Sequence, residues 1–257
     1  MIREYCRPTS LDEALSLLTE EAKDRKPLGG GTHLSRQQEA AFGVIDLQEI
    51  GLDRIATTDQ GITVGAMTRL DQLMATPEVD LEIMRAIQID AAENIRNMAT
   101  LGGWLITSDG RSILTTVLLT LDATSTWEPG KQKIRLGDWL PLRNQAPPGV
   151  LMTEVAWAPT THVAFEYVAR SPKDRPILVV AVARWGSGRT RVTLGGFGDT
   201  PILAMDGPDI SGADVVSRDA CFEADDQWAS AQYRREVAAK LAVRCVQRLD
   251  GFNGSEV

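Results

Sequence analysis

Eight residues near the N-terminus, Pro27-Leu28-Gly29-Gly30-Gly31-Thr32-His33-Leu34, place the strongest constraint on how this chain folds. Three consecutive glycines put no Cβ atom between neighbouring backbone N–H groups, so the backbone can curve closely around an anion. Such N–H groups form a concave site for phosphate, and the Thr32 hydroxyl adds a donor. The same pattern is also typical of a tight turn between two elements, because glycine clusters mark turns more often than ligand sites.

A second glycine stretch, Ala99-Thr100-Leu101-Gly102-Gly103-Trp104, follows about seventy positions later. It again places a threonine beside a glycine pair with apolar residues around it, and we expect a second loop here. Two such loops can hold one extended ligand that carries a diphosphate. Neither stretch matches the dinucleotide fingerprint G-x-G-x-x-G, and no P-loop is present because no Gly-Lys-Ser/Thr occurs.

Composition excludes several classes of function. The net charge of −8 and the isoelectric point of about 4.9 argue against nucleic acid as a partner. No apolar run approaches the ~20 residues that span a bilayer. The start of the chain lacks an apolar signal region, so we expect a cytoplasmic protein. Three cysteines without C-x-x-C and two histidines supply no local motif for an iron–sulfur cluster or other metal site. Redox chemistry therefore requires an organic cofactor or a partner.

Local signals predict a mixture of helices and short strands. Ser10 and Glu13 form a capping box that starts a helix running from Leu11 to about Glu21. Turn residues at 59–61 and 128–130 predict two hairpins. The remaining expected elements are a strand at 44–47, helices at 70–75, 81–94 and 113–121, and a final helix from about 230 to 249.

The order of these features resembles the FAD-binding (medium) subunit family of molybdenum hydroxylases, which includes the carbon monoxide dehydrogenase medium subunit and the xanthine dehydrogenase flavin domain. The family's first signature, Gly-Gly-Gly-Thr-Asp-Leu or Ala-Gly-Gly-His-Ser-Leu, is similar to residues 29–34. Its second, Ala-Thr-Ile-Gly-Gly-Asn, is similar to residues 99–104. Further similarity lies at 7–14, 44–47, 62–68, 170–183, 194–198 and 233–235. The resemblance therefore covers nearly the whole chain.

The resemblance implies an α+β fold. A two-subdomain FAD-binding domain of PCMH type is expected at residues 1–158, and a small α+β C-terminal domain of the CO dehydrogenase flavoprotein type at 159–257. The first loop would hold the FAD pyrophosphate, and the second would press on the flavin side. Asp109 matches a family Asp near the ribityl or phosphate region. The implied cofactor-binding residues are Leu28, Gly29, Gly30, Gly31, Thr32, His33, Leu34, Thr100, Leu101, Gly102, Gly103 and Asp109, with no catalytic residue and no metal ligand.

The implied function is that of a flavoprotein electron-transfer subunit of a molybdenum hydroxylase. FAD would pass electrons between a small 2Fe-2S subunit and an external acceptor. Substrate oxidation would occur at a molybdenum cofactor on a large subunit, so the chain would be an oxidoreductase component of a hetero-oligomer and not the substrate-oxidising subunit.

Two departures from the family pattern favour an alternative function, in which the chain binds no flavin. Trp104 replaces the asparagine after the second glycine pair, and Ile113 replaces the second aspartate of the family's Asp-Pro-Ala-x-Asp. Each lost hydrogen bond would weaken FAD binding by roughly 1 kcal/mol. The alternative is a flavin-free structural or regulatory relative. His33 is either a donor in the flavin site or a solvent-facing histidine, and we expect Arg234 and Arg235 to form an exposed basic face.

Overall fold

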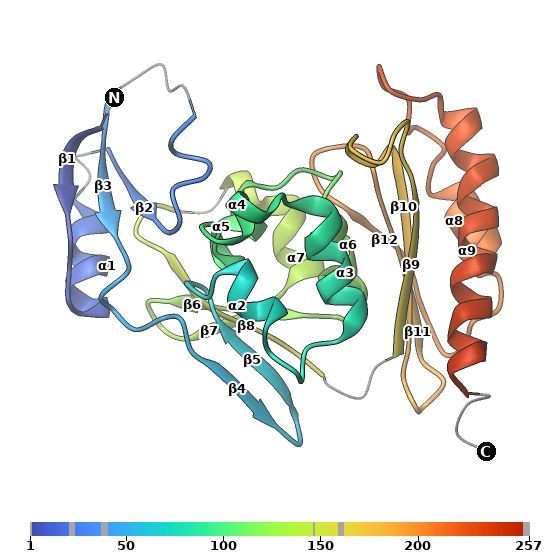
Figure 1. Ribbon diagram of the computed structural model, residues 1–257, viewed down its shortest axis with the longest axis horizontal. Coiled ribbons are helices and arrows are strands. Elements are labelled where there is room, and N and C mark those ends of the chain that lie inside the picture. Colours follow the sequence, from blue (N-terminus) through green and yellow to red (C-terminus); the bar gives the residue numbers. More distant parts are fainter. Residues whose placement is uncertain (1, 21–23, 37–40, 146, 159–161, 254–257) are drawn as a thin grey trace. The chain divides into compact units, whose positions relative to one another are not determined.

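The computed structural model describes residues 2–20, 24–36, 41–145, 147–158 and 162–253 (Figure 1). Contacts divide it into two compact units that are interleaved along the chain. The first contains Met1–Val79, Ala91–Thr107 and Thr124–Trp157, and the second contains Asp80–Asp90, Ser108–Ala123 and Ala158–Val257. The predicted boundary between family domains, at 158–159, borders residues that lie outside the described ranges, and it stays a prediction.

A parallel sheet at the start of the first unit leads into the glycine turn. Its strand order is β1-β3-β2, with β1 at Ile2–Cys6, β3 at Phe42–Asp46 and β2 at Arg25–Leu28. Helix α1 (Leu11–Thr19) packs against it through Ala14. One half of the predicted capping box is confirmed, because the Ser10 hydroxyl accepts from the Glu13 N–H at 3.2 Å. The Glu13 carboxylate accepts from the N–H of Thr9 instead of from that of Ser10.

An antiparallel sheet forms the other part of the first unit. Its order is β4-β5-β8-β6-β7, and its strands span Ile55–Thr58, Gly61–Gly65, Leu151–Trp157, Thr124–Glu128 and Gln132–Arg135. Both predicted hairpins are confirmed by the pairings of β4 with β5 and of β6 with β7. The helical segments of this unit are α2 (Leu70–Met74), α4 (Glu93–Arg96), α5 (Leu101–Thr107), α7 (Leu136–Trp139) and the 3-10 helix η1 (Leu140–Gln145).

The second glycine stretch is the start of a helix, so the prediction of a second loop was wrong. The Thr100 hydroxyl accepts from the Gly103 N–H at 3.3 Å and opens α5. A Cβ on Gly102 would lie 2.8 Å from the Cβ of Ala66. Because Gly102 has no side chain, α5 can approach the end of β5 closely. The glycine is therefore not needed for a turn. The predicted helix at 81–94 is also interrupted, since α3 (Leu81–Asp90) ends before α4 begins.

The second unit is a four-stranded antiparallel sheet covered by helices on both faces (Figure 1). The strand order is β12-β11-β10-β9, at Ile202–Gly207, Thr190–Gly195, Leu178–Arg184 and His162–Val168. Helices α3 and α6 (Ile113–Thr120) pack on one face, and α8 (Ala213–Asp219) and α9 (Ala231–Asn253) pack on the other. Strand β10 is almost continuously buried because both of its faces are covered.

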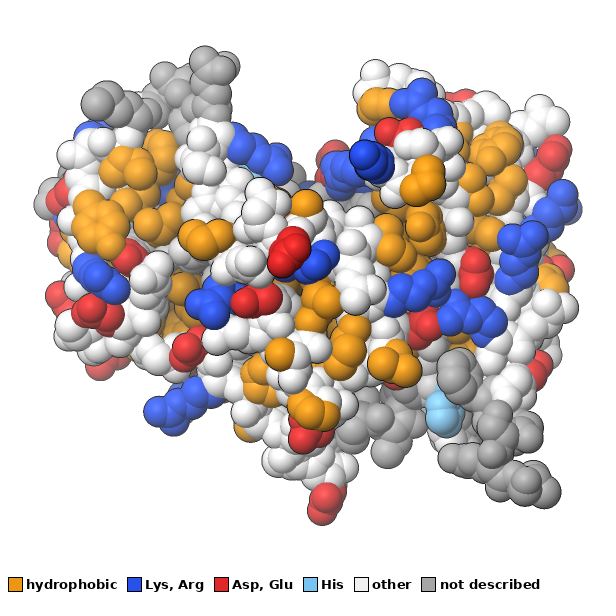
Figure 2. Space-filling model, viewed as in Figure 1, with side chains coloured by type: hydrophobic (Ala, Val, Ile, Leu, Met, Phe, Trp, Pro, Cys, Tyr) orange, Lys and Arg blue, Asp and Glu red, His pale blue; other side chains and the backbone are white. Residues whose placement is uncertain are grey.

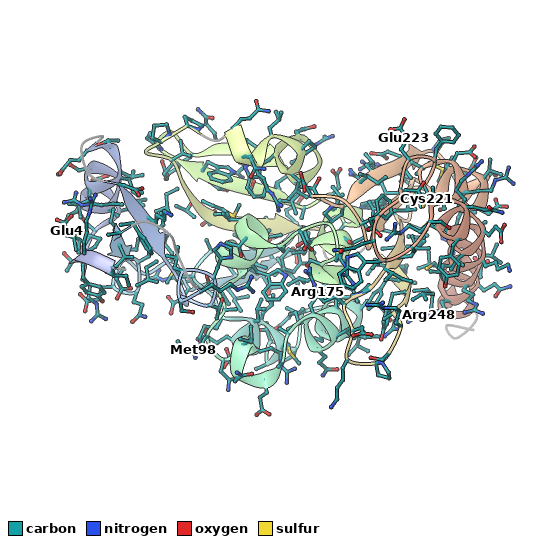
Figure 3. The ribbon with its side chains drawn as sticks, turned by 90° about the horizontal axis from the view of Figure 1, so that it is seen from above. Glu4, Met98, Arg175, Cys221, Glu223 and Arg248 are labelled. Atoms are coloured by element: carbon teal, nitrogen blue, oxygen red, sulfur yellow. The ribbon has the colours of Figure 1, made fainter. Side chains whose placement is uncertain are left out.

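Arg234 on α9 is completely buried, so its prediction as part of an exposed basic face was wrong. Its guanidinium donates to both carboxylate oxygens of Asp226, at 2.9 and 2.8 Å. It also donates to the backbone carbonyls of Ile177, Ala224 and Ala229. Asp226, Ala224 and Ala229 lie in the segment just before α9, whereas Ile177 is 57 positions away. Nearer the end of α9, Arg248 donates to the Phe165 carbonyl at 2.8 Å (Figure 3).

The described surface carries both signs of charge. Figure 2 shows acidic and basic side chains interspersed on the face in view. None of the helices in the described part of the chain is long and apolar enough to cross a bilayer. Within the same residues, no group of three or more His, Cys, Asp or Glu side chains is placed to hold a metal ion.

Candidate functional site

The first glycine turn packs directly against the segment that leads into α5. A Cβ added to Gly30 would lie 1.5 Å from the carbonyl oxygen of Met98, and one added to Gly29 would lie 2.6 Å from the Thr100 hydroxyl. Gly31 has φ +72, a conformation that favours glycine. The three glycines are therefore required by close backbone approach and by the turn itself. The structure thus brings the two sequence motifs together within the first unit.

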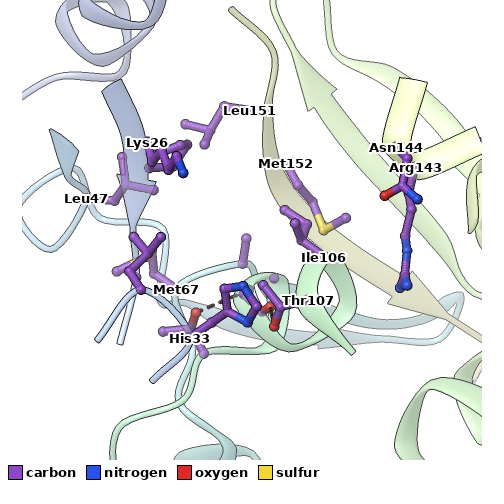
Figure 4. A pocket seen from close by; sticks show the side chains of 17 residues that line it. Lys26, His33, Leu47, Met67, Ile106, Thr107, Arg143, Asn144, Leu151 and Met152 are labelled. Carbon is purple, nitrogen blue, oxygen red and sulfur yellow. Dashed lines mark hydrogen bonds between the residues drawn. The ribbon is translucent and has the colours of Figure 1, made fainter. Parts of the chain in front are cut away.

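A cavity of about 500 Å³ lies beside this turn (Figure 4). Its lining comes from β2 and the glycine turn, from the ends of β3 and β5, from α5, and from η1 and β8. Most of its walls are apolar, through Leu47, Met67, Ile106, Leu151 and Met152. Concave, mainly apolar cavities with a few polar groups are the usual sites for cofactors.

A smaller hollow of about 60 Å³ is bounded by the glycine turn itself and by three residues at or on α5. The turn contributes Gly29 to Leu34, and the α5 side contributes Thr100, Gly103 and Thr107. His33, Thr100 and Thr107 border both hollows. A compact polar group at the turn can therefore be continuous with a larger apolar group in the main cavity.

The charged side chains of the cavity lining are cationic. Lys26 and Arg143 border the main cavity, and none of its described lining residues is an aspartate or glutamate. The ammonium of Lys26 also lies 4.7 Å from the centre of the Phe42 ring, which holds it at the cavity edge. His33 is an exposed residue, as one of the two predicted alternatives has it, but it also borders the cavity. Burial of part of its ring lowers its pKa, and the nearby Arg36 and Lys26 lower it further. The lowered pKa disfavours the charged imidazole at neutral pH. Lys26 and Arg143 give the lining the charge that suits an anion.

Most of the sequence-predicted site residues border one of the two hollows. Those that do are Gly29, Gly30, Gly31, Thr32, His33, Leu34, Thr100, Gly102 and Gly103. Leu28 and Leu101 do not border either hollow. Leu28 ends β2, and its carbonyl accepts from the Leu47 N–H, while Leu101 is fully buried with its N–H bound to the Thr68 carbonyl. These two residues hold the backbone of the lining segments in place through their hydrogen bonds.

Asp109 belongs to the second unit, and its carboxylate is bound by Arg175 (Figure 3). One Arg175 nitrogen donates to it at 2.7 Å, and the Arg111 N–H donates at 2.9 Å. Partial burial acts to raise the pKa of Asp109, but these hydrogen bonds outweigh it and hold the pKa below its ordinary value. The carboxylate is therefore ionised and paired. Its role near the ribityl or phosphate region stays a prediction.

The two departures from the family pattern lie outside the described lining of the cavity. Ile113 begins α6 in the second unit, is fully buried, and donates its N–H to Asp90 at 3.0 Å. Trp104 lies half-buried on α5 but does not border either hollow. The flavin-free alternative therefore gains no support from the cavity.

Sequence reasoning missed several residues of the cavity. Lys26 directly precedes the glycine stretch, and its position next to a suspected anion site was an available signal. Met67 lies in the segment 62–68, where the sequence showed only a similarity to the family and no sign of a cavity residue. Arg143 and Asn144 on η1 reach the cavity from more than a hundred positions away, and no local motif marks them.

Comparison with known proteins identifies the family of this site. The family model described as the FAD binding domain in molybdopterin dehydrogenase matches residues 1–156. The chain belongs to this family. FAD is accordingly its cofactor, and the chain is the FAD-binding component of an oxidoreductase rather than the part that carries molybdenum.

Relatives of this FAD-binding family align with nearly the whole chain. The 6-hydroxypseudooxynicotine dehydrogenase complex subunit alpha of Paenarthrobacter nicotinovorans is 29% identical, covering 95% of this chain and 93% of the relative. The carbon monoxide dehydrogenase medium chain of Afipia carboxidovorans is 27% identical, covering 95% and 96%. The fold matches reconstituted CO dehydrogenase from Oligotropha carboxidovorans with a TM-score of 0.81, 24% identity and coverage of 96% and 97%.

The residues of the site fit FAD. The glycine turn leaves backbone N–H groups unobstructed by side chains, which suits a diphosphate. Lys26 and Arg143 can balance two negative charges, and the apolar walls can cover planar or uncharged parts of the molecule. No carboxylate among the described lining residues opposes the phosphate groups.

Proposed function

We propose that this chain is the flavoprotein electron-transfer subunit of a molybdenum hydroxylase. Its partners would be a small 2Fe-2S subunit and a large subunit that holds the molybdenum cofactor and oxidises the substrate. When bound, FAD supplies the capacity to accept and release electrons between the iron–sulfur subunit and an external acceptor. The names of the relatives support this proposal, because they describe a medium chain and a subunit of a dehydrogenase complex.

One observation carries the proposal on the structural side: the glycine turn and α5 converge on a single cavity with cationic and apolar lining. The N–H groups around Gly29–Thr32 would bind the diphosphate, and Lys26 and Arg143 would balance its charge. Met67, Leu151 and Met152 would exclude water from the rest of the cofactor. The chain's own role is then to bind and orient FAD and to keep it in an apolar environment.

The proposal is tested by purifying the chain through an affinity tag from its native cells and analysing what accompanies it. We expect a complex that contains FAD, iron and molybdenum in fixed ratios, with the absorbance of flavin and of 2Fe-2S clusters. The recombinant chain alone should take up FAD in a ratio near one. A native preparation with FAD but no iron or molybdenum would contradict the assignment to a molybdenum hydroxylase.

A further inference from the structure

We propose that His33 is a proton-linked contact for the FAD diphosphate: its imidazole is neutral in the free protein and takes up a proton when the diphosphate binds. The inference deepens the proposed function and rests on it for the identity of the ligand. It assigns a specific chemical role to the residue at which this chain differs from the family's first signature, where an aspartate or a serine is usual.

The position of His33 places its ring at the junction of the two hollows. It follows the three glycines by two residues and borders both the main cavity and the smaller hollow. Figure 4 shows the ring beside the glycine turn with Thr107 of α5 next to it in the view. Thr100, just before α5, and Thr107 at its end are uncharged, so this side of the hollow offers the imidazole no opposing charge. In the described part of the chain, no hydrogen bond holds the ring in another position.

Partial burial of the ring, and after it the cations around His33, disfavour its protonation until an anion arrives. Lys26 lies before the turn on β2, Arg36 follows the turn, and Arg143 faces the main cavity from η1. The described lining of both hollows contains no carboxylate. Burial and the neighbouring cations together lower the pKa of the free imidazole. A diphosphate carries two negative charges, so its arrival reverses the local field and favours the imidazolium.

The consequence is an affinity for FAD that depends on pH in a defined direction. The bound state has the higher histidine pKa, so binding is accompanied by proton uptake and becomes tighter as the pH falls through that pKa. A rise of one unit on binding corresponds to about tenfold tighter binding at low pH than at pH 8.5. An aspartate at the same position would add negative charge beside the diphosphate and would give no such gain.

The experiment measures FAD affinity and proton uptake on the full chain by calorimetry between pH 5.5 and 8.5, in two buffers of different ionisation enthalpy. Wild type should bind FAD several-fold more tightly at pH 6 than at pH 8.5, with proton uptake near the midpoint. His33→Asn should bind with little dependence on pH in this range. His33→Asp, which restores the family residue, should bind no more tightly than His33→Asn at any pH.

The variants separate this inference from the proposed function. Thermal unfolding monitored by circular dichroism verifies that each variant is folded. Equal FAD affinity of wild type across the whole pH range overturns the role of His33 while leaving FAD as the cofactor. A pH dependence that His33→Asn retains in full also overturns it, because other titrating groups would then be responsible. Failure of FAD to bind at every pH overturns both the inference and the proposed function.

Discussion

The carbonyl oxygen of Met98 occupies the space that a side chain on Gly30 would need, because a Cβ built there lies 1.5 Å from it. Met98 directly precedes the second sequence motif, and Gly30 is the middle glycine of the first. This close approach is what makes two separate motifs into the wall of one cavity. A side chain at position 30 would have to push the two segments apart.

Gly30→Ala should therefore open the cavity. We expect a loss of stability of about 1–3 kcal/mol, the usual cost of overpacking, because the obstructing atom belongs to the backbone and cannot rotate away. FAD affinity should fall with it. Urea denaturation and flavin fluorescence measure the two effects. Gly186→Ala is the matched control, since its Cβ would meet no atom within 4 Å. Near-wild-type FAD affinity in Gly30→Ala would contradict the convergence of the motifs.

Lys26→Met tests the charge balance of the cavity. The substitution keeps an unbranched side chain of similar length while removing the ammonium that borders the site. We expect FAD to bind roughly fivefold to tenfold more weakly, which corresponds to about 1–1.4 kcal/mol. The dependence of affinity on salt should also become weaker. Lys133→Met, on the exposed face of β7, should change neither quantity. Equal losses in both variants would exclude a specific role for Lys26.

Asp90 should make the protein more stable at mildly acidic pH. Burial raises the pKa of its carboxyl to about 6, although hydrogen bonds from the Ile113 and Leu114 N–H groups and from Ser112 act against this shift. A raised folded pKa means that stability is fully present below the unfolded value near 3.8 and is lost as the pH rises through 6. The difference corresponds to about 3 kcal/mol at most.

This expectation is checked by measuring the free energy of unfolding between pH 4.5 and 7.5. Asp90→Asn keeps one carbonyl oxygen as an acceptor and removes the titration, so the difference in unfolding free energy between wild type and variant should change with pH only if Asp90 is responsible. Specifically, wild type should lose stability relative to Asp90→Asn on going from pH 5 to pH 7.5. Asp59→Asn in the exposed β4–β5 turn serves as control. A constant difference across the range would refute the assignment.

Arg234 and its neighbour Arg235 should differ sharply in their contribution to stability. Arg234→Met leaves the Asp226 carboxylate and three carbonyls without their donor, and removing one partner of a buried ion pair typically costs 3–5 kcal/mol. Arg235 is partly exposed and lies 3.8 Å from Asp219, so Arg235→Met should cost less than about 1 kcal/mol. Thermal and urea unfolding compare the pair. Similar losses for both would show that the buried network contributes little.

Elements with local signals were predictable from the sequence. Ser10 marks the start of α1 because its hydroxyl caps the N–H of Glu13, only three residues further on. The glycines at 61 and 130, with φ +148 and φ +99, permit turns that the flanking strands require. The glycine turn at 29–31 was predictable for the same reason. In each case the residues that decide the structure are neighbours in the chain.

Features that depend on distant neighbours were not predictable in this way. Gly102 looked like part of a loop, yet its role is to let α5 approach Ala66, which lies more than thirty positions away. Arg234 looked exposed because nothing in the α9 sequence shows that it packs against Ile177, which lies 57 positions away. Arg143 reaches the cavity only because η1 follows the β6–β7 hairpin in the folded unit. The family resemblance supplied the cofactor, but not these side chains.

Helix α6 has a consequence for how the protein is made. All eight of its residues are buried, and the strands β10 and β11 that cover it lie about sixty to seventy positions further along the chain. At a synthesis rate of roughly 5–20 residues per second, the ribosome releases this apolar helix several seconds before its covering strands exist. The growing chain therefore exposes an aggregation-prone apolar segment until β10 and β11 have been synthesised. Chains released before residue 195 are the products we expect chaperones to retain and proteases to remove.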